Sequence, residues 1–282
     1  MLAAITVGIW AMIFMTALMR GMVDDMLING IRSMPGEVQI HHPLYRDDPS
    51  INNSISEPGG ELLKALQGDE VVAWTSRVKV PAVISSERDS LGIVLLGVEP
   101  ESEIEVSFDA DSIVEGRFLE SAEDRGLVIG RKMAEHLETR LGKRVVIMSQ
   151  DPDNNIADRG FRIVGIYTAK LASLEEMYVY AGRDTLQKML NIQGQVSEIV
   201  ATGDDYRYVD SWLPVIEHAA GDELETMSWQ QANRYLGSMI AMMDGFVLVW
   251  VFIIFLALSF GLVNTLVMAV FERIREIGLM LA

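Results

Sequence analysis

The sequence predicts an α+β domain outside the membrane, made of two subdomains and flanked by two transmembrane α-helices that extend beyond the membrane as stalks. Both ends of the chain carry an apolar run without a charged residue, Met1–Met19 and Phe246–Val270. Each run has the roughly 20 residues that a helix needs to cross a hydrocarbon core. Between the runs, short strand-like and helix-like segments alternate without a regular βα repeat, which favours an α+β arrangement.

The charge of the chain is concentrated between the two apolar runs. The formal net charge is −17, and almost all of the 40 acidic residues lie in the middle segment. An acidic surface of this size argues against a nucleic-acid partner and against binding to an anionic membrane surface. The chain has no cysteine, so it has no disulfide framework and no thiol chemistry.

The predicted segments follow one another in a simple order. They are a transmembrane helix at 1–19, a stalk helix at 20–35, a domain at 36–227 with a second subdomain inserted near 85–175, a stalk helix at 228–245, a transmembrane helix at 246–270 and the start of a cytoplasmic segment at 271–282. Arg273 and Arg275 follow the second run closely, so the positive-inside rule places that end in the cytoplasm and the domain outside. The first run lacks a basic segment before it, and the chain stops directly after the second, so we expect a piece of a longer protein.

Both stalks are predicted from apolar spacing close to 3.6 residues. After the first run, Met22, Met26 and Ile31 continue the helical pattern, which we expect to end near Pro35. The second stalk begins with Ser228 and Gln231, the spacing of a capping box. Its apolar stripe, interpreted as a face packed against the first stalk, consists of Trp229, Ala232, Tyr235, Leu236, Met239, Ile240 and Met243.

The middle segment contains short runs rich in β-branched residues, separated by helical patterns. The predicted strands are Glu37–His41, Val71–Ile84 with an interruption at Pro81, Leu91–Val98, Leu127–Ile129, Val145–Met148, Phe161–Ile166, Met177–Tyr180 and Glu198–Ala201. The predicted helices are Glu61–Gln67, Lys132–Arg140, Arg183–Leu190 and Tyr208–Ala219. Polar loops are expected at Asp47–Gly60 and Asp151–Gly160.

No pattern for catalysis or metal binding stands out. His41 and His42 are adjacent, so on a strand they point to opposite faces and do not converge on a metal. Asp151 and Asp153 resemble the start of a calcium loop, but Ile156 occupies the position that requires glycine. The chain contains no phosphate-binding loop of the G-x-x-x-x-G-K-[ST] type. We therefore expect no catalytic residue, no cofactor and no metal site, and no enzymatic activity on this chain.

The most informative local pattern lies at the end of the second apolar run. In Asn264–Gly278, the apolar helix continues directly into a charged segment. Glu272 and Glu276 are four residues apart, and Ile274 and Ile277 are three apart, so charged and apolar side chains lie on separate faces. Basic anchors at a membrane surface account for Arg273 and Arg275, whereas an amphipathic continuation is better suited to docking on a cytoplasmic partner.

These residues resemble the end of the second transmembrane helix and the coupling segment of MacB/FtsX-type ABC transporter permeases. The matching positions are Asn264, Thr265, Phe271–Arg273 and Arg275–Gly278. The segment Val114–Leu137 and the later stretch FRIVGIY are similar to the periplasmic core domain of that family. The early first span and VSEIVATGDD resemble the lipoprotein-releasing branch (LolC/LolE-like) most closely.

The resemblance implies a permease subunit in the bacterial inner membrane, with its central domain in the periplasm. A separate cytoplasmic ABC ATPase would bind near Phe271, Glu272, Arg273, Ile274, Arg275, Glu276 and Ile277 and move the second span. The stalk residues Trp229, Tyr235, Leu236, Met239 and Met243 would pass this motion to the domain. The other implied partners are a second permease copy or homologue, a lipoprotein or other amphiphilic cargo, and a periplasmic acceptor.

Two alternatives share this layout. A two-span receptor with a periplasmic sensor domain predicts a heptad-patterned linker after the second span. A regulator of cell-wall hydrolases, built on the same FtsX-like plan, keeps the spans but transports nothing. Two further apolar spans beyond residue 282 would favour a permease over a receptor.

Overall fold

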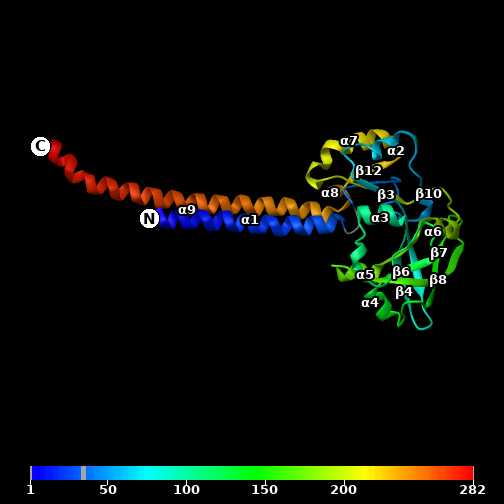
Figure 1. The fold of residues 1–282 in the computed structure, drawn as a ribbon. Helices are drawn as coiled ribbons and strands as arrows, with labels where there is room; N and C mark the ends of the chain where they lie inside the picture. The colour runs from blue at the N-terminus through cyan, green and yellow to red at the C-terminus, as the bar shows by residue number, and fades with distance from the viewer. Residues whose placement is uncertain (1, 33–35, 282) are drawn as a thin grey trace. The chain divides into compact units, whose positions relative to one another are not determined.

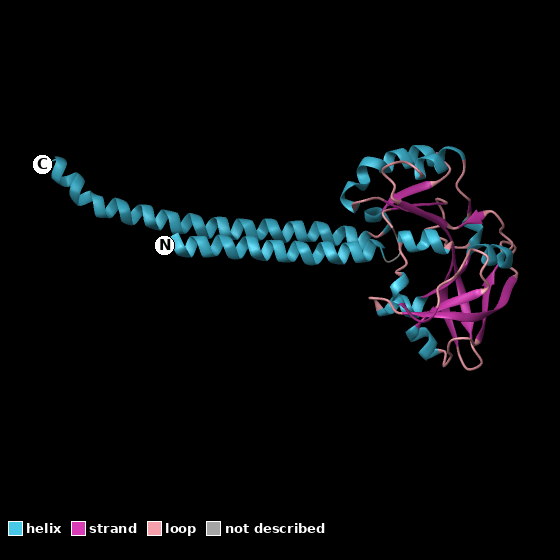
Figure 2. Ribbon diagram, in the orientation of Figure 1, coloured by secondary structure: helices cyan, strands magenta, loops and turns pink. Residues whose placement is uncertain are grey.

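The computed structural model describes residues 2–32 and 36–281, apart from the side chains of some residues in the two long helices. The contacts divide the chain into two units, Met1–Leu27 with Arg234–Ala282, and Ile28–Asn233. The first unit contains α9 (Arg234–Leu281) and all of α1 (Leu2–Arg32) up to Leu27, and the two long helices lie side by side (Figure 1). The second unit is a mixed α/β domain (Figure 2).

Helix α9 contains a stretch that is long and apolar enough to cross a membrane. This stretch is Gly245–Phe271, with a mean hydropathy of 2.9 and no buried residue in its most apolar window. It is the one such stretch found among the described residues. The second predicted span thus has a structural counterpart, whereas the first, Met1–Met19, is helical from Leu2 onward but is not confirmed as a membrane span. The expected end of the first stalk at Pro35 lies outside the described residues.

The second long helix does not begin where the sequence predicted. Ser228 and Gln231 do form a capping box, but the helix that they start, α8, covers only Trp229–Ala232. Asn233 follows with φ −120° and ψ 85°, outside the helical region, and α9 starts at Arg234. The expectation of one continuous helix from Ser228 was therefore wrong, because the backbone turns at Asn233.

The domain is organised around one ten-stranded sheet with an open part and a closed part. In the open part, strands run in the order β12 (Glu225–Ser228), β1 (Val38–His41), β11 (Glu198–Thr202) and β3 (Ala73–Ser85), all antiparallel. Helices α2 (Gly60–Leu66) and α7 (Val209–Ala220) pack against one another here, and α7 also contacts β12. A separate pair, β2 (Ile55–Ser56) with β10 (Gln195–Val196), completes this part.

The closed part is a ring of six strands that shares β3 with the open part. From β3, the ring continues through β4 (Ser90–Val98), β9 (Tyr178–Gly182), β6 (Gly126–Gly130), β8 (Ile156–Tyr167) and β7 (Arg144–Gln150), which pairs again with β3. Strand β5 (Ile113–Gly116) is added at the side of β8. Closure pairs the outer strands with one another, so the ring has no free sheet edge of its own. The prediction of two subdomains, with the second inserted near 85–175, stays a prediction because the contacts keep Ile28–Asn233 as one unit.

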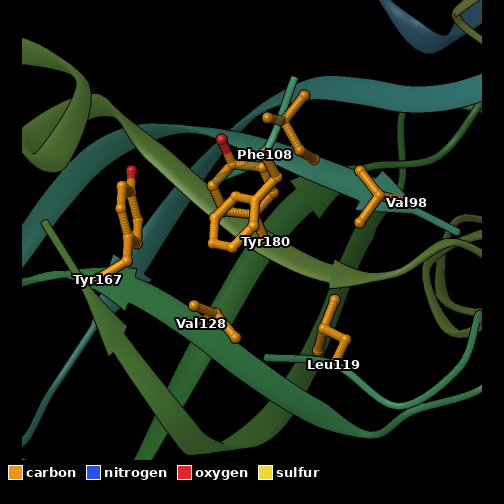
Figure 3. Packing of buried hydrophobic residues seen from close by; sticks show 7 residues of the cluster. Val98, Phe108, Leu119, Val128, Tyr167 and Tyr180 are labelled. Carbon is orange, nitrogen blue, oxygen red and sulfur yellow. The ribbon is translucent and has the colours of Figure 1, made fainter. Parts of the chain in front are cut away.

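Short helices are distributed around the ring. They are α3 (Pro100–Val106), α4 (Arg131–His136), α5 (Ala172–Met177) and α6 (Arg183–Leu190), with 3-10 turns at Ile51–Asn53, Ala110–Ser112 and Tyr206–Tyr208. Aromatic residues cover one outer face of the ring (Figure 3). The rings of Phe108 and Tyr180 meet edge to face at 5.1 Å, and those of Tyr167 and Tyr180 at 5.5 Å. Such pairs add to the stabilisation that burial provides.

The strand β3 runs through Pro81, where the sequence predicted an interruption. Proline lacks the N–H that a central strand position needs. Pro81 pairs with Val94 of β4 on one side. On the other side it falls in the gap between β11, which pairs with residues 73–77, and β7, which pairs with residues 83–85. No ladder bond is therefore missing on that side, and the prediction of a break was wrong.

Two glycines of β8 provide a matched test of how tightly the ring is packed. A methyl group at Gly165 would overlap the carbonyl oxygen of Arg117, whereas at Gly160 it would meet nothing within 4 Å. We expect Gly165→Ala to lower the free energy of unfolding by about 2 kcal/mol through overpacking. Thermal unfolding of the detergent-solubilised chain measures this, as a fall in Tm of roughly 4–8 °C for a domain of this size.

Gly160→Ala serves as the control and should leave Tm unchanged or slightly raised, because glycine in a strand interior weakens the strand. Equal loss of Tm in both variants would contradict the packing of β8 described here.

Candidate functional site

The chain enters and leaves the domain through neighbouring strand ends, which we call the joint (residues 36–38 and 228–229). Val38 in β1 is the register partner of Ser228 in β12. Next to this pair, the backbone N–H of Trp229 donates to the carbonyl oxygen of Glu37 at 2.8 Å. The N–H of Glu37 donates in turn to the carbonyl oxygen of Ala201 in β11, at 3.0 Å. The two connections are therefore fastened to the same sheet.

The entry side of the joint requires glycine. Gly36 has φ +62°, a conformation that side chains with a Cβ rarely adopt. A methyl group there would also overlap the side chain of Val200. The N–H of Gly36 donates to the carbonyl oxygen of Ile31 at 2.9 Å, which satisfies a carbonyl near the end of α1. The close approach of this turn to β11 therefore fixes how the chain enters the sheet.

The exit side of the joint is anchored by Trp229. Its side chain is 1% exposed, and its indole N–H donates to the carbonyl oxygen of Tyr206 at 3.2 Å. The rings of Trp229 and Tyr206 meet edge to face at 5.5 Å. Trp229 was predicted as the first residue of a stalk face, but the structure places it inside the domain. It fastens the end of β12 to the turn before α7.

A buried ion cluster, formed by Arg77, Lys79, Glu103 and Glu198, lies further along the same sheet. Arg77 of β3 makes a bidentate pair with Glu103 of α3, with Nε to Oε2 at 2.8 Å and Nη2 to Oε1 at 2.7 Å. Its Nη1 also lies 3.4 Å from Oε1 of Glu198, its register partner in β11. Lys79 donates to Oε2 of Glu198 at 3.1 Å. The side chains of Arg77 and Glu103 are fully buried.

Opposite charges in the ion cluster favour the charged forms of Arg77 and Glu198 inside the domain. Burial alone would lower the pKa of Arg77, but the carboxylates of Glu103 and Glu198 raise it above its ordinary value. Burial alone would raise the pKa of Glu198, whereas Lys79 and Arg77 hold it below its ordinary value. Ser107 supports the pair by accepting from Nη2 of Arg77 at 2.8 Å and donating to Oε1 of Glu103 at 2.6 Å. Geometry of this quality is what a buried ion pair needs to offset its desolvation.

The position of the ion cluster makes it a fastening between the two parts of the sheet. Strand β3 pairs with β11 over residues 73–77 and with β4 over residues 78–85. Arg77 is thus the last residue of the open part, and its partners come from β11 and from α3. Strand β11 is in this way connected to β3 and hence to the ring.

The joint and the ion cluster consist of contacts within the fold. Over residues 2–32 and 36–281, no group of three His, Asp or Glu side chains could hold a metal ion. The carboxylates of Glu103 and Glu198 form ion pairs with Arg77 and Lys79 inside the fold. The joint and the ion cluster connect elements of the fold.

The predicted coupling residues lie on the last part of α9. The side chains of Phe271, Arg273 and Ile274 are exposed, Phe271 by 69% and Ile274 by 51%. The side chains of the other predicted coupling residues lie outside the described ones, as do those of four predicted stalk residues. These are Glu272, Arg275, Glu276 and Ile277, and Tyr235, Leu236, Met239 and Met243.

The fold is a mixed α/β domain whose entering and leaving strands, β1 and β12, are paired side by side. The profile of the MacB-like periplasmic core domain matches residues 1–211. The chain belongs to this family, and it is a membrane protein with an extracytoplasmic domain of the ABC transporter permease type.

One curated relative and two solved structures are similar to the chain. An uncharacterized ABC transporter permease of Methanocaldococcus jannaschii is 26% identical over 178 residues, which are 60% of this chain and 42% of that protein. The chain therefore spans less than half the length of this relative. The periplasmic region of MacB from Actinobacillus actinomycetemcomitans aligns over 76% of this chain and 95% of its own, at 13% identity and a TM-score of 0.49. The extracellular domain of the transporter YknZ from Gram-positive bacteria aligns over 68% and 99%, at 15% identity and a TM-score of 0.48.

Removing one partner of the ion cluster should destabilise the domain strongly. Glu103→Gln removes a charge with little change of volume and leaves Arg77 buried beside a single remaining carboxylate. We expect a loss of about 3 kcal/mol in the free energy of unfolding. Chemical denaturation of the detergent-solubilised chain measures this.

Glu123→Gln is the matched control, because Glu123 forms an exposed ion pair with Lys188 at 3.1 Å. This variant should stay within about 0.5 kcal/mol of the wild type. A similarly small effect of Glu103→Gln on the free energy of unfolding would show that the buried pair contributes little to the stability of the domain.

The ion cluster also predicts how stability changes in acid. Because the pKa of Glu198 is lowered in the folded state, its contribution is fully present above its ordinary value of 4.5. As the pH falls from there through the lower pKa of the folded state, the unfolded chain takes up the proton first and this contribution is lost. Unfolding free energies measured between pH 6 and about pH 3 should fall less steeply in Glu198→Gln than in the wild type. Identical slopes would contradict the charge state assigned to Glu198.

Proposed function

We propose that the chain is the permease subunit of an ABC transporter and transmits ATP-driven motion from a separate cytoplasmic ATPase to its extracytoplasmic domain. The observation that carries this proposal is the family match over residues 1–211, which includes the first long helix together with most of the domain. In this proposal both α1 and α9 cross the bacterial inner membrane, with the domain in the periplasm.

The proposed path of the motion follows fastened elements. The ATPase binds the end of α9 at Phe271–Ile277 and moves this helix. The joint passes the movement to β1 and β12, and the ladder of β1 with β11 carries it to β3. The ion cluster then couples β11 and α3 to β3 and hence to the ring. Such transmission requires stiff connections, and the burial of Glu37 and Trp229 supports this for the joint itself.

The proposed cargo is a lipoprotein or another amphiphile, as in the lipoprotein-releasing branch that the sequence resembles. A helix such as Gly245–Phe271, with no ionisable side chain between its ends, offers no polar pathway for a solute. The motion would instead act on cargo outside the membrane, together with a second permease copy or homologue and a periplasmic acceptor.

Replacing Glu272 or Arg275 by alanine should weaken ATPase binding without unfolding the domain. Both residues lie in the proposed docking segment, where loss of a charge-assisted contact reduces affinity by about tenfold or more. The measurement is co-purification of a co-expressed cytoplasmic ABC ATPase with the tagged full chain. Glu61→Ala, an exposed change in α2, is the control and should retain the ATPase. ATPase retention equal to that of the control would exclude the docking assignment.

A further inference from the structure

One corner of the ring gathers basic side chains that have no acidic partner. This basic corner consists of Arg140, Lys143, Arg144 and Arg162, all of them exposed. In the part of the chain that the structure describes, none of their side chains forms an ion pair or a hydrogen bond. The chain as a whole has a formal net charge of −17. Four exposed cations without an acidic partner are thus notable in a chain with a strongly negative net charge.

The fold brings these four residues together. Arg144 of β7 and Arg162 of β8 are register partners, directly opposite one another. The N–H of Ile163 donates to the carbonyl oxygen of Lys143 at 2.9 Å, and the N–H of Lys143 donates to that of Arg140 at 3.1 Å. Like charges directly opposite on neighbouring strands are destabilising. An anion placed between the two guanidinium groups would relieve this repulsion, and phosphate suits their forked donors.

An apolar strip continues from the basic corner along the same outer face of the ring. It consists of Pro81, Val83, Val146 and Met148. Alternation places the strip outside, because Val145 and Ile147, the inward residues of β7, are buried. Val146 is 41% exposed and Val83 is 38% exposed. Met148 is the register partner of Val83, so the strip crosses from β7 to β3.

The strip is flanked by two glycines, so no side chain projects beside it at these positions. Gly160 is the register partner of Val146, and Gly92 is the partner of Val83. A methyl group at either glycine would meet nothing within 4 Å. From Arg144 to Met148 the strand extends about 13 Å. The surface thus offers a cationic end followed by a shallow apolar track.

Asp158 gives this surface a direction. It is exposed and lies opposite Met148, at the end of the strip away from Arg144. An anionic group is repelled at the Asp158 end and attracted at the Arg144 end. A purely acidic protein surface would satisfy the basic corner but would leave the apolar strip in water.

We propose that the basic corner and the apolar strip bind one anionic amphiphile with a phosphate head group. The head group lies between Arg144 and Arg162, and the alkyl chain follows Val146, Met148 and Val83. The site takes a single molecule, so it is compatible with an acidic domain that does not bind an anionic leaflet. The identification of this ligand as transport cargo rests on the proposed function.

The test uses the full chain in nanodiscs of phosphatidylcholine, without the ATPase. An alkyl phosphate that carries a photoreactive diazirine in its chain is added below its micellar concentration. After illumination, mass spectrometry locates the label. We expect labelling on β7, β8 and the end of β3, and displacement by unlabelled alkyl phosphate. Because ATPase binding is measured separately, failure of this labelling would leave the coupling proposal intact, and failure of coupling would leave this site intact.

Matched variants distinguish recognition of the phosphate head group from recognition of the alkyl chain. Arg144→Glu with Arg162→Glu should reduce labelling by about tenfold or more, as expected for lost charge-assisted contacts. Arg46→Glu with Arg131→Glu makes the same change in charge at two exposed arginines elsewhere and should leave labelling unchanged. Val146→Thr with Met148→Gln should weaken labelling while the unfolding temperature stays close to that of the wild type.

Four outcomes would overturn the proposal. Labelling that survives Arg144→Glu with Arg162→Glu would exclude the head-group site. Equal labelling by a neutral alkyl maltoside with the same diazirine would show a site without charge selection. Displacement by inorganic phosphate at the same concentration as the alkyl phosphate would show that the alkyl chain of the ligand does not contribute to binding. Displacement by an oligoglutamate peptide would assign the basic corner to an acidic protein partner.

Discussion

The buried pair of Arg77 and Glu103 is the interaction on which the rest of the domain depends. Removing two charges from water is expensive, and only a bidentate geometry with further donors and acceptors offsets that penalty. Here Ser107 and Glu198 complete the set, so every charge has a partner. Replacement of a buried ion pair by apolar residues of similar volume is often neutral for stability. What the ionic pair adds is direction, because a forked guanidinium donates to its carboxylate in one orientation and thereby sets how α3 lies on β3.

The joint and the ion cluster act in series along one sheet. The joint fastens the entry and exit of the domain to β1 and β12, and the hydrogen-bond ladders carry that constraint to β11 and β3. Arg77 lies where β3 leaves β11 and enters the closed ring. The domain is therefore held as one body, with its two ends fixed close together. The basic corner and the apolar strip lie on the ring, which is the part of this body farthest along the sheet from the joint.

Local patterns in the sequence predicted the elements better than their connections. The apolar runs, the capping box at Ser228 and most strands followed from composition and period. The helix α3, which carries Glu103, was missed, although Pro100 and the acidic residues after it are typical of a helix start. The continuity through Pro81 depends on strand partners distant in sequence, which local periodicity does not contain. Arg77 could have been noticed as a charge within a strand-like run, but its partners depend on the register of β11 and on α3.

The joint, the open part of the sheet and the ring should unfold as one cooperative body. Native-state hydrogen exchange of the detergent-solubilised full chain, followed over increasing denaturant, tests it most directly. The amides of Val200 in β11 and of Leu95 in β4 should converge on a single opening free energy, equal to that of global unfolding. Two separate opening free energies, with β11 opening while β4 stays protected, would show that the ion cluster does not hold the open part of the sheet and the ring together. The domain would then not be one cooperative body.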